Sequence, residues 1–191
     1  MKVLLLCLKA FETMEFSVFV DIMGWARDEE EVDINVVTCG FNKTVVSTFG
    51  IPIIMDTLID SVDVNNYDAL AIPGGFQEYG YRDEAFDIKT LELIRKFNSQ
   101  NKPIASICVA AFALAKSGIL NGRRATTYQA RLKELASYED IIVINEPIVI
   151  AGNIITSYNP QTAPGVAFKL LQMLSVEEKV DSIKRMMGFI E

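Results

Sequence analysis

The hydrophobic positions of this 191-residue chain form short apolar runs that alternate with stretches of helical periodicity. Apolar runs of strand length between turn residues are typical of buried strands, and apolar positions three and four apart indicate amphipathic helices. Strands are predicted at 3–8, 33–39, 67–75 (ending in a Pro-Gly-Gly turn), 102–107, 123–128 and 141–146, with a small hairpin or meander at 43–59 and a hairpin at 148–158. Helices are predicted at 14–26, 88–98, 109–117, 130–136 and 162–174, followed by an amphipathic tail at 176–190. The charged run 27–31 is interpreted as a solvated loop.

This alternation predicts the fold class. Strands that alternate with helices favour an α/β architecture, with a doubly wound, mainly parallel sheet and helices on both faces. Neither an internal repeat nor a linker interrupts the pattern. We therefore expect one domain over residues 1–191.

Composition and charge exclude several function classes. The net charge is -7 and the basic residues do not cluster, which argues against nucleic-acid binding. The apolar start is read as a strand rather than a signal peptide, and no apolar run reaches the length of a membrane span. Three cysteines without CxxC spacing suit a reducing, cytoplasmic setting better than a disulfide framework or a zinc site. We expect no metal, no cofactor, no nucleic acid and no membrane.

The chain contains no histidine. Cys–His dyads, Ser–His–Asp triads and histidine-ligated metals are therefore excluded within one chain. Amide hydrolysis by a cysteine needs a proton for a poor amine leaving group, which histidine normally supplies. Proteolysis is therefore not expected.

Three features fall at the carboxyl edge of the predicted sheet, where doubly wound folds form their sites. Cys108 follows the strand KPIASI directly and opens an apolar helix, as a nucleophile on a sharp turn would. Gly74 and Gly75 follow YDALAIP, where exposed N–H groups would stabilise an oxyanion. Glu15 lies in the opening turn of the first helix. Each also has a plain structural interpretation: a packed thiol, a turn, and a favourable acid at a helix start.

The chain resembles the ThiJ/DJ-1/PfpI superfamily, of the class I glutamine amidotransferase-like fold, over nearly its whole length. The matching stretches are AFETMEFSVFVDIM, YDALAIPGG, PIASICVAAFALAKSGILNGRRATTY and TSYNPQTAPGVAFKLLQML. The resemblance implies a flavodoxin-like three-layer sandwich, dimeric in most members, and a connection to stress responses. It also implies a reactive Cys108, hydrogen-bonded by a protonated Glu15, and an oxyanion site formed by the N–H groups of Gly75 and Val109.

The resemblance also implies further pocket residues. Pro160 and Thr162 match a loop that borders the pocket in some members, and Gly74 belongs to the glycine pair. Tyr128 stands where many members carry a histidine after the ATT strand. Val109 stands where protease-like branches carry a histidine and isonitrile-hydrating members a threonine. These departures make this chain a histidine-less member of the superfamily.

Three functions remain open at the level of sequence. The first is a cysteine-dependent enzyme, glyoxalase- or hydratase-like, in which a Cys108 thiolate of lowered pKa adds to a small electrophile and Glu15 moves the proton. The second is an oxidative-stress sensor that acts through oxidation of Cys108. The third is a small-molecule-binding module without chemistry. The expected partners are a small-molecule substrate or oxidant and a second copy in a homodimer.

Overall fold

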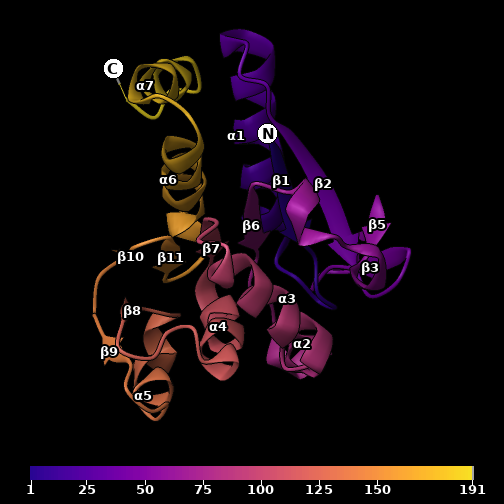
Figure 1. Cartoon of the computed structure of the whole chain (residues 1–191), viewed down its shortest axis with the longest axis vertical. Helices are drawn as coiled ribbons and strands as arrows, with labels where there is room; N and C mark the ends of the chain where they lie inside the picture. Colours follow the sequence, from indigo (N-terminus) through magenta and orange to yellow (C-terminus); the bar gives the residue numbers. More distant parts are fainter. Residues whose placement is uncertain (191) are drawn as a thin grey trace.

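The computed structural model describes residues 1–190 as a central sheet covered by helices on both faces (Figure 1). The strands are β1 Lys2–Leu6, β2 Asn35–Gly40, β3 Thr44–Val46, β4 Pro52–Ile54, β5 Thr57–Leu58, β6 Ala69–Ile72, β7 Ile104–Ser106, β8 Arg124–Ala125, β9 Ile142–Val143, β10 Ile148–Ala151 and β11 Ile154–Ser157. The α-helices are α1 Thr13–Glu30, α2 Tyr81–Ala85, α3 Ile88–Ser99, α4 Ala111–Ser117, α5 Leu132–Leu135, α6 Ala163–Leu174 and α7 Glu177–Met186.

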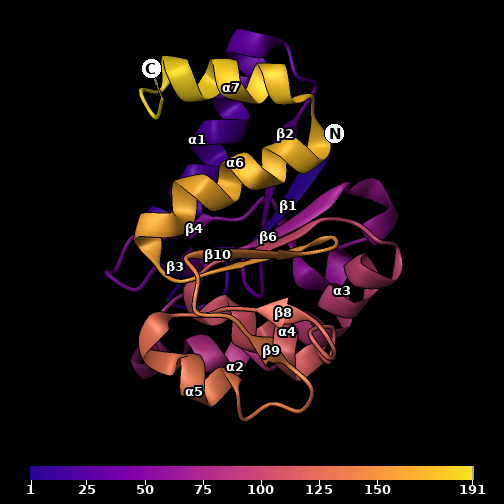
Figure 2. The same ribbon diagram turned by 90° about the vertical axis from the view of Figure 1, so that its left-hand side faces the viewer.

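The main sheet has seven strands in the order β10-β11-β7-β6-β1-β2-β5. All neighbours are parallel except the β10–β11 hairpin at one edge. Because β1 is an interior strand, between β6 and β2, its alternating side chains face two different layers. Val3, Leu5 and Cys7 pack with α1, α6 and α7, whereas Leu4 and Leu6 pack with α2, α3 and α4. Figure 2 shows these two helical layers on opposite sides of the sheet. The predicted flavodoxin-like, doubly wound α/β fold is confirmed.

Three local predictions need correction. The charged run 27–31 is not a loop, because α1 continues to Glu30 and ends at Glu31, whose φ of 50° is left-handed. Lys179 of α7 donates a hydrogen bond to the carbonyl of Glu30, which supports this last turn. The stretches at 123–128 and 141–146 form only two-residue strands, which pair in a small separate sheet. The end of the 43–59 segment leaves its hairpin, and β5 joins the edge of the main sheet.

The carboxyl ends of β1, β6 and β7 bring three chain segments together. The segment after β1 leads into α1, the segment after β6 holds the glycine pair, and the segment after β7 begins with Ile107 and Cys108. An isolated bridge between Phe11 and Gly75 joins the first two segments. Ile107 donates its N–H to the carbonyl of Ile72, which joins the second and third. The candidate site is therefore built at the sheet edge that the strand order predicts.

Candidate functional site

Cys108 is the first residue of a sharp turn between β7 and α4, and its backbone is strained. Its φ is 56°, a left-handed conformation that costs a non-glycine residue roughly 1–2 kcal/mol. A short 3-10 turn, Cys108–Ala110, follows and leads into α4. The hydroxyl of Thr127 donates a hydrogen bond of 2.9 Å to the Cys108 carbonyl and helps to hold the turn. Strain of this kind is found where a side chain must be presented at one fixed position.

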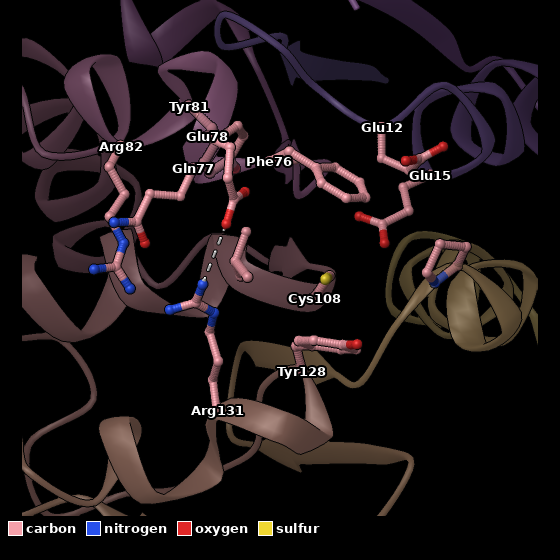
Figure 3. A pocket seen from close by; sticks show the side chains of 13 residues that line it. Glu12, Glu15, Phe76, Gln77, Glu78, Tyr81, Arg82, Cys108, Tyr128 and Arg131 are labelled. Atoms are coloured by element: carbon pink, nitrogen blue, oxygen red, sulfur yellow. Dashed lines mark ion pairs between the residues drawn. The ribbon is translucent and has the colours of Figure 1, made fainter. Parts of the chain in front are cut away.

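Glu15 is fully buried in the first turn of α1, and its carboxyl faces the Cys108 sulfur (Figure 3). One oxygen, Oε2, accepts a 2.6 Å hydrogen bond from the backbone N–H of Gly74. A Cβ built on Gly74 would lie 2.8 Å from Cβ of Cys108, from Oε2 of Glu15 and from the Ile107 carbonyl. Gly74 is therefore the surface against which the acid and the thiol are packed, and any side chain there would push them apart. The sequence pattern predicted that the N–H groups of both glycines would be exposed to an oxyanion. The Gly74 N–H instead donates to Glu15, so it is not available for that role.

Burial sets the proton affinities of this pair. Desolvation raises the pKa of Glu15 to about 8, so the carboxyl is mainly protonated at neutral pH. Burial is also the largest cause that raises the pKa of Cys108, followed by the charge of an ionised Glu15, and the Val109 N–H only partly offsets these effects. The position of Cys108 on a sharp turn at the start of a helix predicted a lowered pKa for its thiol, and this lowering is not found. A free site at neutral pH holds a thiol beside a carboxylic acid.

Two backbone N–H groups belong to residues that line a cavity together with Cys108. Val109 N–H is directed at Cys108, and Gly75 N–H makes no backbone hydrogen bond within residues 1–190. Gly75 must be glycine, because a Cβ would overlap the Ala10 carbonyl oxygen and the ring of Tyr81. The Tyr81 hydroxyl donates a 2.6 Å hydrogen bond to the Pro73 carbonyl and fixes that ring behind the glycine pair.

A cavity of about 350 Å³ opens over the sulfur. Its lining includes Cys108, Glu15, Gly75 and Val109, and two of the residues predicted for the pocket, Tyr128 and Pro160. Thr162 does not line it: this buried residue donates its hydroxyl to the Asn159 carbonyl at the turn before α6. Gly74 also lies behind the wall rather than in it.

Sequence reasoning missed the charged part of this cavity. Glu12, Gln77, Glu78, Arg82 and Arg131 also line it. At the mouth, Arg131 pairs with Glu78 at 4.0 Å, as Figure 3 shows. For most of these residues the sequence offered no signal, because they lie on a 3-10 turn and a short helix that the hydrophobic pattern did not predict. Glu12 was detectable, since it precedes Glu15 by three residues at a helix start. Within residues 1–190 no cluster of acidic or cysteine side chains suitable for a metal ion occurs.

Comparisons with known proteins show the family to which the chain belongs. The family model described as the DJ-1/PfpI family matches residues 1–173. The chain belongs to the DJ-1/PfpI family. It is 30% identical over 179 residues to the protein dj-1beta of Drosophila melanogaster, covering 91% of this chain and 89% of that one. The crystal structure of Drosophila melanogaster DJ-1beta superposes with a TM-score of 0.86, covering 97% of this chain and 96% of that one at 27% identity.

Two other relatives show the breadth of the family. The deglycase PfpI of Pyrococcus furiosus is 30% identical over 161 residues, which is 84% of this chain and 91% of that one. The protein DJ-1 homolog B of Arabidopsis thaliana is 27% identical over 88% of this chain, but the match spans only 36% of the plant protein. No helix in the described part of the chain is long and apolar enough to cross a bilayer.

Proposed function

We propose that this protein is a cysteine-dependent enzyme that acts on small carbonyl electrophiles, with glyoxalase-like conversion of a 2-oxoaldehyde as its reaction. The observation that carries the proposal is the Cys108–Glu15 pair in a small cavity, together with the Val109 N–H directed at Cys108 and the Gly75 N–H without a backbone acceptor within residues 1–190. The name deglycase, which the Pyrococcus furiosus relative bears, supports an enzymatic role.

In the first step Cys108 adds to the aldehyde carbon. Because the site holds a thiol rather than a thiolate, its proton must leave as the carbon–sulfur bond forms, and Glu15 in its ionised form is the acceptor. The carbonyl π electrons move onto oxygen, where the N–H groups of Gly75 and Val109 stabilise the developing charge. Glu15 then returns the proton to that oxygen and leaves a neutral hemithioacetal.

In the second step the ionised Glu15 removes the proton from the former aldehyde carbon, and the electron pair moves toward the neighbouring ketone. The resulting enediolate takes up a proton at the former ketone carbon, while the proton of the former aldehyde hydroxyl passes to the former ketone oxygen. This gives a 2-hydroxy thioester on Cys108. Water then displaces the thiol and releases a 2-hydroxy acid. One water is added for each 2-oxoaldehyde, with no net oxidation, so the reaction needs no redox cofactor.

Proteolysis is a poor candidate for the same site. A peptide bond needs acid catalysis at the amine leaving group, and the chain offers no histidine for it. Tyr128 lines the cavity where the resemblance places a histidine. A phenol is a weak substitute at neutral pH, because it holds its proton too tightly.

Purified wild-type protein is expected to convert methylglyoxal into lactate. In D₂O the product should carry deuterium at C2, because the proton that Glu15 delivers exchanges with solvent. The measurement is NMR of the product over time, with heat-denatured protein as the blank. Absence of turnover would reject the enzyme, and lactate without deuterium would reject the proton-shuttle role of Glu15.

Oxidative sensing through Cys108 is the second candidate. Cys108 is half-buried and opens into the cavity, whereas Cys7 and Cys39 are fully buried, and burial raises the pKa of Cys39 to about 12. A protonated Glu15 would donate a hydrogen bond to an oxidised sulfur. If methylglyoxal is not turned over, selective gain of two oxygens at Cys108 under mild peroxide would favour this function. The three free thiols support a cytoplasmic location for either function.

We also propose that the protein is a homodimer. The tip and one edge of the β3–β4 hairpin expose large apolar side chains, with Phe49 at 68% and Ile54 at 71% exposure. The hairpin is held beside the start of α1 by hydrogen bonds to the Ala10 and Phe11 backbone, and Met14 on α1 is also exposed. Apolar side chains gathered in this way favour a protein partner, and the family resemblance implies a second copy.

Sedimentation equilibrium is expected to give about twice the monomer mass for the wild type. Ile54→Lys should shift the protein toward the monomer, because it places a charge in the apolar interface. Ile142→Lys, which changes another exposed isoleucine, on β9 and outside the hairpin, is the matched control and should remain dimeric. A monomeric wild type would reject the proposal.

A further inference from the structure

Glu12 is a nearly buried carboxylate in the cavity wall with no partner of its own. It is 7% exposed, and its backbone is fixed at the start of α1: its N–H donates to the Gly74 carbonyl at 2.7 Å, and its carbonyl accepts from Phe16. Within residues 1–190 its carboxylate forms no ion pair and accepts no hydrogen bond. A buried charge left in this condition is unfavourable unless a ligand or the helix N-terminus compensates it.

The positive charges of the cavity are already committed elsewhere. Arg82 pairs with Glu134 and lies over the rings of Phe86 and Phe112. Arg131 pairs with Glu134 at 3.0 Å and with Glu78 at 4.0 Å. Two arginines and two glutamates therefore balance at the mouth. Glu12 stands at the N-cap position of α1 but makes no side-chain capping hydrogen bond there. Within residues 1–190 its carboxylate has no cationic side chain as a partner, and it lies on the same side of the sulfur as Glu15 in Figure 3.

We propose that Glu12 is a specificity-determining residue that binds a cationic nitrogen of the substrate, so that Cys108 acts on electrophiles bearing an ammonium or guanidinium group. This inference rests on the proposed function and names the substrate class for it. The substrate's cation would lie a few bonds from the carbon that Cys108 attacks, because both groups line one cavity of about 350 Å³.

The same charge links binding to reactivity. The negative charge of Glu12 raises the pKa of Glu15 and of Cys108. A cation seated against Glu12 offsets that effect, so the thiol gives up its proton more readily when the right substrate is bound. An anionic substrate meets the opposite situation and is repelled. A cationic substrate is therefore favoured twice, because it binds more tightly and because it promotes ionisation of the Cys108 thiol.

The test measures alkylation of Cys108 by three reagents of different charge: bromoacetate, bromoacetamide and 2-bromoethylamine. Each rate constant is divided by that of a small free thiol at the same pH, which removes the intrinsic reactivity of the reagent. Intact mass reports on Cys108, because Cys7 and Cys39 are fully buried, and Cys108→Ser gives the blank. In the wild type the normalised rate of the cation is expected to exceed that of the anion by at least about 10-fold.

Glu12→Gln is expected to reduce this ratio by about 10-fold, and Glu92→Gln, which removes an exposed charge from α3, should leave it unchanged. A wild type without cation preference would overturn the inference, and that measurement does not depend on the folding of any variant. An unchanged ratio in a folded Glu12→Gln protein would also overturn it. Cation preference without methylglyoxal turnover would retain the Glu12 site and reject the proposed reaction. Methylglyoxal turnover without cation preference would retain the proposed reaction and reject the Glu12 site.

Discussion

Replacing Cys108 with serine is expected to lower methylglyoxal turnover by on the order of 10³-fold or more. The substitution keeps the size of the side chain and the left-handed backbone, but a hydroxyl is a far weaker nucleophile than a thiol. Glu15, the Gly75 and Val109 N–H groups and the cavity all remain in place. The loss should therefore appear in kcat, while binding of the aldehyde changes little. Steady-state kinetics with lactate detection, together with a thermal melt to verify folding, measure this effect.

Cys39→Ala is the matched control for loss of a thiol. Cys39 is fully buried on β2, and burial raises its pKa to about 12, so it has no access to substrate. Activity per folded molecule should be retained in this variant, although removal of a buried sulfur costs some stability. Turnover that survives Cys108→Ser would show that the chemistry resides elsewhere in the protein.

Replacing Glu15 with glutamine is expected to lower kcat by about 10²- to 10⁴-fold. Glutamine still accepts the Gly74 N–H, so the packing against Cys108 is kept while proton transfer is lost. The pH profile should change as well. In the wild type, kcat/KM should rise through pH about 8, where the buried pair loses its first proton and gains a base for the thiol. In Glu15→Gln the Cys108 thiol must ionise without a neighbouring base. Because burial raises the pKa of this thiol, the rise of kcat/KM should move to higher pH.

Glu15→Asp provides the conservative comparison. It keeps a carboxyl but shortens the reach by one methylene, so a partial recovery of kcat relative to Glu15→Gln is expected. If Glu15 served only to pack against the turn that carries Cys108, aspartate would not restore kcat relative to glutamine. An unchanged pH profile in Glu15→Gln, or a loss of less than about 10-fold, would contradict the role of general acid and base.

The order of apolar runs and amphipathic stretches was sufficient to predict the layers and the edge at which the site forms. Parallel strands in a doubly wound sheet end at one edge, so Glu15, Gly75 and Cys108, which follow three different strands, had to lie near one another. The extension of α1 through Glu30 was missed because a charged run looks solvated in sequence. Its support comes from Lys179, about 150 residues away along the chain.

The sequence by itself determined the family, the fold class and the identity of the thiol and the acid, because strand order and local turn chemistry are encoded in short segments. Only the tertiary structure decided what surrounds them. It assigned the Gly74 N–H to Glu15, removed Thr162 from the cavity wall and placed Glu12 in that wall without a hydrogen-bond or ion-pair partner within residues 1–190. It also decided the direction of the Cys108 pKa, because desolvation depends on how many distant segments close over a group. No local pattern in the chain records that burial.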